Sequence, residues 1–182
     1  MKVDHKLSES VISYRANINA SPDKLWEIIS TPGNLNFCHP FCKENTVTKW
    51  GEIGAEDAIT YYNGHVLYRL FTEWNEGKGY ELLIGHGTYA TAKVLWTITD
   101  IKDGTSELSI DINVYSDIAL KKYSKPLRVI IREFYFLPNM SKYVKAVVKG
   151  FKFYIETGTP VKKNQFGYNR MFSTNIKNSY TK

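Results

Sequence analysis

Apolar and polar residues alternate in two segments of the chain, residues 89–99 and 106–115. Successive side chains of a β-strand point to opposite faces, so a period of two is typical of a half-buried strand. Each segment is therefore predicted to be a strand with one buried and one solvated face. The buried sets are Ala90, Ala92, Val94, Trp96 and Ile98 in the first strand, and Leu108, Ile110, Ile112 and Val114 in the second.

Shorter apolar runs separated by turn residues fill most of the chain before these two segments. Asn63-Gly64 and Asp103-Gly104 are strong hairpin signals, because both residue types tolerate a positive φ. Such tight links join consecutive, antiparallel strands. The buried face of residues 65–74 stays open, since both alternating sets there contain bulky apolar groups. The predicted strands are residues 10–19, 46–50, 58–62, 65–74, 80–86, 89–99 and 106–115.

Two short helices are predicted directly after the first strand. Ser21 is a suitable N-cap, Pro22 fits a first helical turn, and Asp23 complements the positive end of the helix dipole. A second short helix is expected around residues 35–37.

The C-terminal third contains the clearest amphipathic helix. Pro138 follows an apolar segment, residues 127–136, and predicts a kink or a new helix start, because proline is tolerated only in a first turn. Gly158 is the expected end of the helix. One face of this helix is apolar and the other is basic. The apolar face is Met140, Tyr143, Val144, Val147, Phe151, Tyr154 and Ile155, and the basic face is Lys142, Lys145, Lys149 and Lys152.

Together these elements predict an α+β helix-grip fold. A curved antiparallel sheet of about seven strands would wrap a long C-terminal helix. The element order and the stretch INASPDKLWEIIS (residues 18–30), followed by PGNL (residues 32–35), resemble the START and polyketide cyclase/dehydrase superfamily. This superfamily, also called SRPBCC, includes the birch-pollen-allergen-like proteins. The resemblance covers residues 10–158 and implies an internal cavity for a lipid-like or aromatic molecule.

The expected domain organisation is one helix-grip domain, residues 1–158, followed by a basic and partly flexible extension, residues 159–182. The stretch GTPVKKNQFG that begins at Gly158 is similar to an extension in an uncharacterised bacterial subgroup of the superfamily, which adds no function to the prediction. The last ten residues are expected to fray.

Composition adds a surplus of aromatic residues and an uneven charge. The 13 Tyr, 9 Phe and 4 Trp suit both a core and the wall of a ligand pocket. The net charge of +6 combines a net of −6 over residues 1–118 with a net of +12 over residues 119–182. No apolar stretch approaches a membrane span or a signal peptide, and two cysteines require no disulfide framework, so a cytoplasmic location is expected.

The cavity is expected between the concave face of the sheet and the helix at residues 138–157. Two alanines on an inward face leave space that a packed core would fill. The predicted floor is Ala90, Ala92 and Trp96, and the predicted roof is Met140, Val144, Val147 and Phe151. Tyr61, Tyr68 and Tyr89 are candidates to orient a ligand through their hydroxyl groups.

Arg69 lies within an otherwise apolar strand and has two interpretations. It could anchor a ligand carboxylate or phosphate through paired hydrogen bonds. Alternatively, it lies on the solvated face and pairs with an acid such as Glu73, Glu81 or Asp57. The second interpretation is preferred.

The cluster FCHPFC at residues 37–42 combines two thiols and an imidazole. Its Cys-x-x-x-Cys spacing has no second pair of ligands, and no acid is placed to orient a Cys–His pair. It is therefore interpreted as a loop that packs at the cavity mouth. No metal, cofactor or catalytic residue is predicted.

The expected function is binding, transport or sensing of an apolar small molecule or lipid. The alternative is a cyclase, dehydrase or hydrolase acting on a polyketide-like or aromatic substrate, which would bury a convergent set of titratable groups in the cavity. Nucleic-acid binding is not predicted, because no recognition motif accompanies the lysines.

The row Lys142, Lys145, Lys149 and Lys152 has two interpretations. A solvated helix face is the simpler one. However, like charges at this spacing repel, and no Asp or Glu between Pro138 and Ile155 offsets them. The hypothesis is a weak, salt-dependent contact with an anionic membrane surface.

Overall fold

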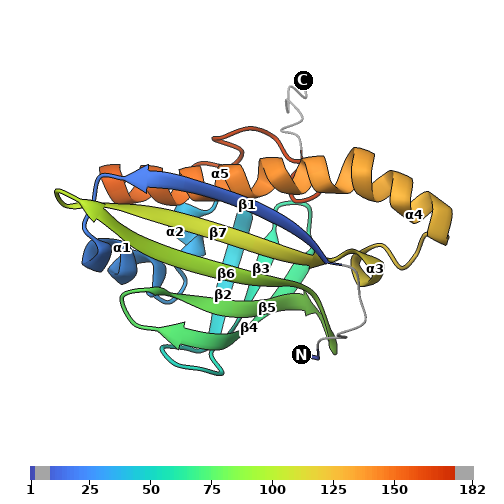
Figure 1. The fold of residues 1–182 in the computed structure, drawn as a ribbon, viewed down its shortest axis with the longest axis horizontal. Coiled ribbons are helices and arrows are strands. Elements are labelled where there is room, and N and C mark those ends of the chain that lie inside the picture. The colour runs from blue at the N-terminus through green and yellow to red at the C-terminus, as the bar shows by residue number, and fades with distance from the viewer. Residues whose placement is uncertain (3–8, 175–182) are drawn as a thin grey trace, which may run out of the picture.

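The computed structural model describes residues 1–2 and 9–174 and forms a curved seven-stranded sheet against a long helix (Figure 1). The strand order is β1-β7-β6-β5-β4-β3-β2, and every neighbouring pair is antiparallel. The predicted meander is thereby confirmed. The strands are β1 (Glu9–Ile18), β2 (Cys42–Lys49), β3 (Glu56–Tyr61), β4 (Val66–Asn75), β5 (Gly79–His86), β6 (Tyr89–Lys102) and β7 (Thr105–Tyr115).

The helices begin and end near the predicted signals. Ser21 Oγ accepts a hydrogen bond from the Lys24 amide at 3.3 Å, which caps the first helix. The last helix begins at Leu137 with Pro138 in its first turn, and Gly158 ends it with a φ of 67°. The helices are α1 (Pro22–Ile29), α2 (Leu35–Cys38), α3 (Ser116–Ala119), α4 (Lys125–Ile131), the π-helical η1 (Arg132–Phe136) and α5 (Leu137–Thr157).

Helix α5 lies along the sheet, with α1 at the left end of the molecule and α3 and α4 at the right end in Figure 1. The apolar sets predicted for β6 and β7 are buried, and Val144, Val147 and Phe151 bring the apolar face of α5 against them. The α+β helix-grip fold follows from these two apolar surfaces, because each can leave water only against the other. Within the described residues, no helix has the length and apolar character needed to cross a bilayer.

The register of β4 resolves the face that the sequence left open. Arg69 and Phe71 are buried, whereas Tyr68 is exposed. Asp57 is the cross-strand partner of Arg69 in the β3–β4 ladder and is buried as well. The inward face of β4 therefore carries an arginine, and its expected position on the solvated face is wrong.

A β-bulge between β5 and β6 changes the position of Ala90. The register shifts between Ile84 and Gly85, which pair with Ala92 and Ala90 respectively. The extra residue reverses the alternation, so Ala90 packs with Leu83 in a small separate cluster. The prediction that Ala90 lies on the cavity floor is wrong for this reason.

Residues 159–174 of the C-terminal extension lie against the rest of the structure. The Val161 amide donates to the Phe37 carbonyl at 2.8 Å, and the Asn164 amide donates to the Pro40 carbonyl at 3.0 Å. Phe172 is buried in the main core. Of the ten terminal residues expected to fray, residues 175–182 lie outside the described range.

Candidate ligand-binding cavity

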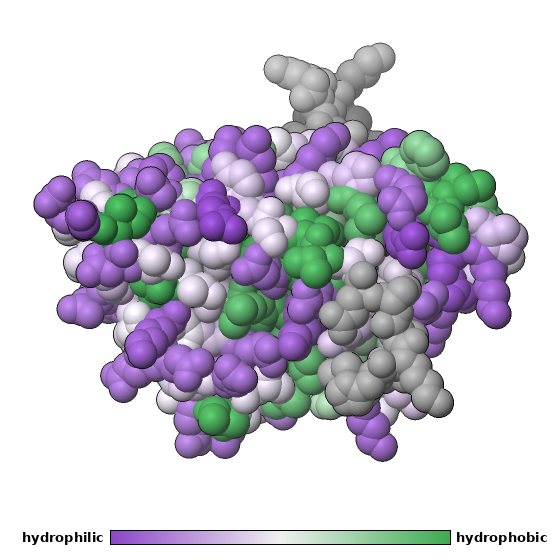
Figure 2. Space-filling view, in the orientation of Figure 1, coloured by the Kyte–Doolittle hydropathy of each residue, from purple (hydrophilic) through white to green (hydrophobic). Residues whose placement is uncertain are grey.

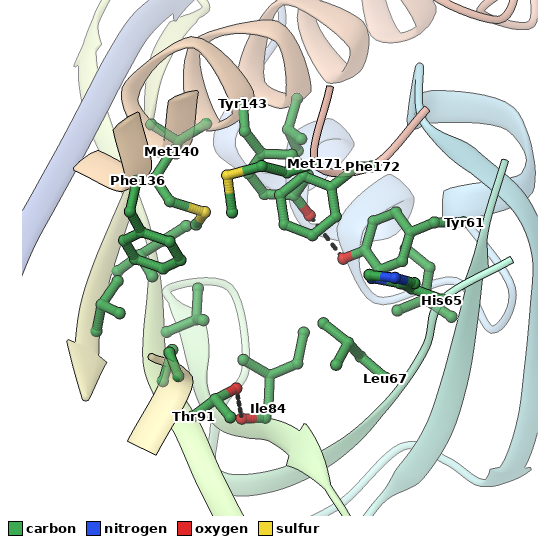
Figure 3. Close-up of a pocket in the computed structure, with 18 of the residues that line it drawn as sticks. Tyr61, His65, Leu67, Ile84, Thr91, Phe136, Met140, Tyr143, Met171 and Phe172 are labelled. Carbon is green, nitrogen blue, oxygen red and sulfur yellow. Dashed lines mark hydrogen bonds between the residues drawn. The ribbon is translucent and has the colours of Figure 1, made fainter. Parts of the chain in front are cut away.

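A cavity of about 510 Å³ opens between the concave face of the sheet and α5. Most of its wall is apolar. Figure 3 shows Phe136 and Met140 on one side, Leu67 and Ile84 from the sheet below, and side chains of the C-terminal extension above. Its volume and apolar wall are typical of a small-molecule site.

Seven of the eleven predicted site residues line this cavity, and four do not. Tyr68 and Tyr89 are 54% and 53% exposed, so they cannot face an interior ligand. Phe151 is fully buried behind the wall, where its ring contacts Trp96 at a centroid distance of 4.8 Å. Ala90 lies in the separate cluster described above. The lining residues are Tyr61, Arg69, Ala92, Trp96, Met140, Val144 and Val147.

Three polar side chains in the wall form one hydrogen-bonded chain. The ring nitrogen Nε2 of His39 lies 3.0 Å from the hydroxyl oxygen of Tyr143. That oxygen lies 3.0 Å from the hydroxyl oxygen of Tyr61, as the dashed line in Figure 3 marks. All three residues line the cavity. The end of α2, strand β3 and helix α5 therefore converge on one polar site in an apolar wall.

The backbone sets the direction of this chain. The amide of Phe41 donates to Nδ1 of His39 at 3.1 Å, so Nδ1 is the acceptor nitrogen of the ring. A neutral imidazole then carries its proton on Nε2 and donates it to Tyr143. This hydrogen-bonded chain contains two hydrogen bonds but three donor protons, those of Nε2 and the two hydroxyls. One hydroxyl proton is left for another acceptor, whichever tyrosine donates across the Tyr61–Tyr143 link.

Burial keeps all three groups uncharged near neutral pH. Desolvation lowers the pKa of His39 to about 3, with a smaller contribution from the nearby Arg69 charge. Desolvation also raises the pKa of Tyr143 to about 12 and that of Tyr61 well above its ordinary value. The chain can therefore donate and accept hydrogen bonds, but none of its members titrates near pH 7.

Arg69 and Asp57 form a buried ion pair beside this chain. Nε of Arg69 donates to Oδ1 of Asp57 at 2.6 Å, Nη2 donates to Oδ2, and the Asn45 amide donates to Oδ2 at 3.0 Å. Burial opposes the charged guanidinium, but the Asp57 carboxylate holds the pKa of Arg69 above its ordinary value. The expected pairing of Arg69 with a cross-strand acid is confirmed, and Asp57 is the partner among the three acids that the sequence offered. The pair is neutral overall and adds no net charge to the cavity wall.

The two thiols lie in the core near this site. Burial raises the pKa of Cys38 above its ordinary range and that of Cys42 to about 12, so neither is a thiolate at neutral pH. Within the described part of the chain, no group of three His, Cys, Asp or Glu residues could hold a metal ion.

Two contributions to the cavity were not predicted from the sequence. His39 was interpreted as loop packing, yet its bonding partner Tyr143 lies 104 positions away. Met171 and Phe172 belong to a segment expected to be an extension, yet both line the cavity. The only sequence signal for the second contribution is the pair of apolar residues in a polar tail.

Exposed residues mark the mouth of the cavity. His65 and His86 lie at the ends of β-strands, and Lys122, Tyr135 and Arg170 come from the α3–α4 region and the C-terminal extension. Among the described residues that line the cavity, none is Asp or Glu. The mouth is therefore bordered by basic and aromatic groups.

The sequence matches no family model, and no curated protein matches it. Solved structures do share its fold. A START superfamily protein from Mycobacterium smegmatis superposes with a TM-score of 0.63 at 13% identity, covering 84% of this chain and 100% of that one. DynU16, encoded in the dynemicin biosynthetic locus, gives a TM-score of 0.63 at 15% identity, covering 89% of this chain and 51% of that one.

An enzyme is also among the similar structures. A norcoclaurine synthase point mutant from Thalictrum, in complex with a transition-state analogue, has a TM-score of 0.53 at 13% identity. The match covers 80% of this chain and 95% of that one. The chain thus shares the helix-grip fold of these structures, as the sequence resemblance implied. At such low identity the shared fold does not assign a function.

Proposed function

We propose that the protein binds an apolar small molecule that carries one neutral hydrogen-bond acceptor, such as a ketone or an ester oxygen. The apolar body would occupy the space between Trp96 and Val147, and the oxygen would lie against the Tyr61–Tyr143 pair. The fold supports a cavity ligand at the level of the superfamily, and the ligand class is our inference from the cavity wall.

The observation that carries this proposal is the geometry of the Tyr61–Tyr143 link, which leaves one hydroxyl proton without an acceptor among the described residues. A buried donor without an acceptor costs free energy, about 1–3 kcal/mol, so a ligand oxygen that accepts this proton gains affinity. The part of the wall beside the two tyrosines carries no net charge, because His39 is neutral and Arg69 is paired with Asp57, whereas Lys122 and Arg170 lie at the mouth. A carboxylate placed against the two tyrosines would lose its hydration without meeting a free positive charge there.

The first test measures binding of prodan, a neutral naphthalene dye with one ketone oxygen, by its fluorescence. Ala92→Phe fills the cavity from the floor, and we expect it to weaken prodan binding at least tenfold. Leu95→Phe is the matched control, because Leu95 lies on the exposed face of the same strand. Equal affinity of the two variants would contradict the proposal. Native mass spectrometry of freshly purified protein would show whether a natural ligand co-purifies.

The second test isolates the polar end of the cavity. The triple variant His39→Leu, Tyr61→Phe and Tyr143→Phe removes the whole hydrogen-bonded chain, since any one member left alone still carries a donor. We expect prodan binding to weaken about fivefold, the value of one hydrogen bond of about 1 kcal/mol. Binding of 2-(dimethylamino)naphthalene, which lacks the ketone, should not change. A similar loss for both dyes would indicate a packing effect and contradict the assigned contact.

A second candidate function is an enzyme of the cyclase, dehydrase or hydrolase type. The observation in its favour is the set of buried titratable groups His39, Tyr61, Arg69 and Tyr143 in the cavity wall. Two hydroxyl donors could stabilise an enolate oxygen. However, efficient proton transfer needs a pKa near the working pH, and His39 and Tyr143 are shifted away from it. Mass spectrometry after incubation with a poly-β-keto thioester tests this candidate, and we expect no product.

We also propose that Lys142, Lys145 and Lys149 attract the protein weakly to anionic membranes. These three side chains are exposed on α5. The expectation of four uncompensated charges is wrong, because Lys152 Nζ lies 3.1 Å from the carboxylate of Glu156. A triple Lys→Gln variant should reduce the salt dependence of vesicle binding. The expected cytoplasmic location stays a prediction.

A further inference from the structure

The segment of α4 and η1 exposes an unusual amount of apolar surface. Ile130 is 57% exposed and Phe134 is 83% exposed, and α4 contains no buried residue. In Figure 2, apolar side chains gather at the right end of the molecule, where Figure 1 places α4. The large apolar residues exposed in this segment are Leu127, Val129, Ile130, Phe134 and Tyr135.

Three of these residues share one side of the helix. Leu127, Ile130 and Phe134 follow one another at steps of three and four residues, the spacing of neighbours on a helix surface. Ile131 and Phe136, which point the other way, line the cavity. The same short helix therefore borders the cavity on its inner side and offers an apolar face to the surroundings. We call Leu127, Ile130 and Phe134 the α4 face.

Basic residues stand at the start of α4 and just before it. Lys121, Lys122 and Lys125 are exposed and form no salt bridge with any described residue. Two arginines of the segment are paired, Arg128 with Asp117 and Arg132 with Glu133, each at 2.8 Å. The surroundings of the apolar face therefore keep a net positive charge.

We propose that the α4 face docks the protein on an anionic lipid bilayer. Leu127, Ile130 and Phe134 would enter the boundary between head groups and acyl chains, and Lys121, Lys122 and Lys125 would contact the lipid phosphates. An amphipathic helix with an apolar face and flanking lysines is the arrangement that binds such interfaces. A second copy of this chain suits the face less well, because its lysines would meet like charges.

Docking by the α4 face would hold the cavity mouth beside the lipid. Lys122 and Tyr135 belong both to the mouth and to the segment that docks. An apolar ligand could then pass between bilayer and cavity without crossing water. This role in ligand exchange rests on the proposed function, whereas docking itself does not.

The test is co-sedimentation with vesicles of equimolar phosphatidylglycerol and phosphatidylcholine, compared with pure phosphatidylcholine. The wild type should bind the anionic vesicles, and Ile130→Ser with Phe134→Ser should reduce this binding at least tenfold. The matched control is Ile53→Ser with Ile101→Ser, which removes two exposed isoleucines that lie outside α4 and η1, in the β2–β3 loop and in β6. We expect the control to bind within twofold of the wild type.

A fluorescence measurement locates the inserted residue independently. In the Phe134→Trp variant, the emission of the new tryptophan should shift to the blue on anionic vesicles. In the Ile53→Trp variant, it should not shift. Because Phe134→Trp keeps an aromatic ring, it still tests docking if the double serine variant does not fold.

Four results would overturn the proposal. The first is sedimentation of the double serine variant at the wild-type level. The second is a loss of binding in the triple Lys→Gln variant of Lys142, Lys145 and Lys149 while the double serine variant still binds. The third is the absence of wild-type binding to either vesicle. The fourth is a wild-type protein that binds no vesicle and forms a dimer in light scattering, which the double serine variant converts to a monomer. Prodan separates docking from ligand binding, because Ile130 and Phe134 do not line the cavity and their variant should bind prodan normally.

Discussion

Asp57 and Arg69 stand directly opposite each other on β3 and β4, with both side chains on the inner face of the sheet. Two nitrogens of the guanidinium donate to the two carboxylate oxygens. Because this ion pair is buried in the cavity wall, it fixes the local geometry of the two strands without attracting an anionic ligand. Removing one partner of such a buried pair is strongly destabilising, whereas a surface pair contributes little to the free energy of unfolding.

Asp57→Asn should destabilise the protein by about 3–5 kcal/mol, because it leaves the Arg69 charge buried without its counter-ion. The double variant Asp57→Leu with Arg69→Met removes both charges and should lose less than the single variant does. Urea unfolding of the single and double variants measures this difference. A double variant less stable than Asp57→Asn would show that the pair stabilises the fold beyond mutual neutralisation.

Tyr143→Phe should destabilise the protein by about 1–3 kcal/mol, because the Nε2 proton of His39 loses its buried acceptor. Tyr61→Phe removes only the end of the chain and should cost about 0.5–1.5 kcal/mol. Chemical denaturation at pH 7 compares the two variants. The central place of Tyr143 is contradicted if Tyr61→Phe proves the more costly change.

Stability should fall as the pH falls below about 6.5, because His39 has a pKa of about 3 when folded and 6.5 when unfolded. Between these values the unfolded chain binds one more proton than the folded chain, so acid favours unfolding. The expected slope is at most about 1.4 kcal/mol per pH unit. In His39→Gln, the loss between pH 6.5 and pH 5 should be smaller by up to about 2 kcal/mol. Parallel stability curves for wild type and variant would show that His39 does not titrate in this way.

Gly150→Ala should destabilise the protein even though alanine favours a helix by about 1 kcal/mol. The added Cβ would overlap the carbonyl oxygen of Cys38, where α5 passes closest to the end of α2. We expect a net cost of about 1–3 kcal/mol in thermal or chemical unfolding. The neighbouring and exposed Lys149→Ala should change stability by less than about 0.5 kcal/mol. A more stable Gly150→Ala would mean that the two segments separate easily.

The sequence by itself determined the elements and their order. Alternation in β6 and β7 identified their buried faces, because the other face of each strand is mostly polar. The apolar stripe of α5 likewise had to meet those faces. The helix-grip fold and the place of the cavity follow from these local patterns, and Trp96 and Val147 were predicted to line it for that reason.

Only the tertiary structure decided which side chains meet in the cavity. Ala90 does not lie on the cavity floor, because one bulge residue reverses the alternation of β6. Arg69 lies on the inner face of β4, because both faces of that strand are apolar enough to be buried. His39 and Tyr143 form their hydrogen bond across 104 positions, a distance at which no periodicity carries information. The exposure of Phe134 was equally hidden, since an apolar run looks the same in a sequence whether the fold covers it or leaves it in water.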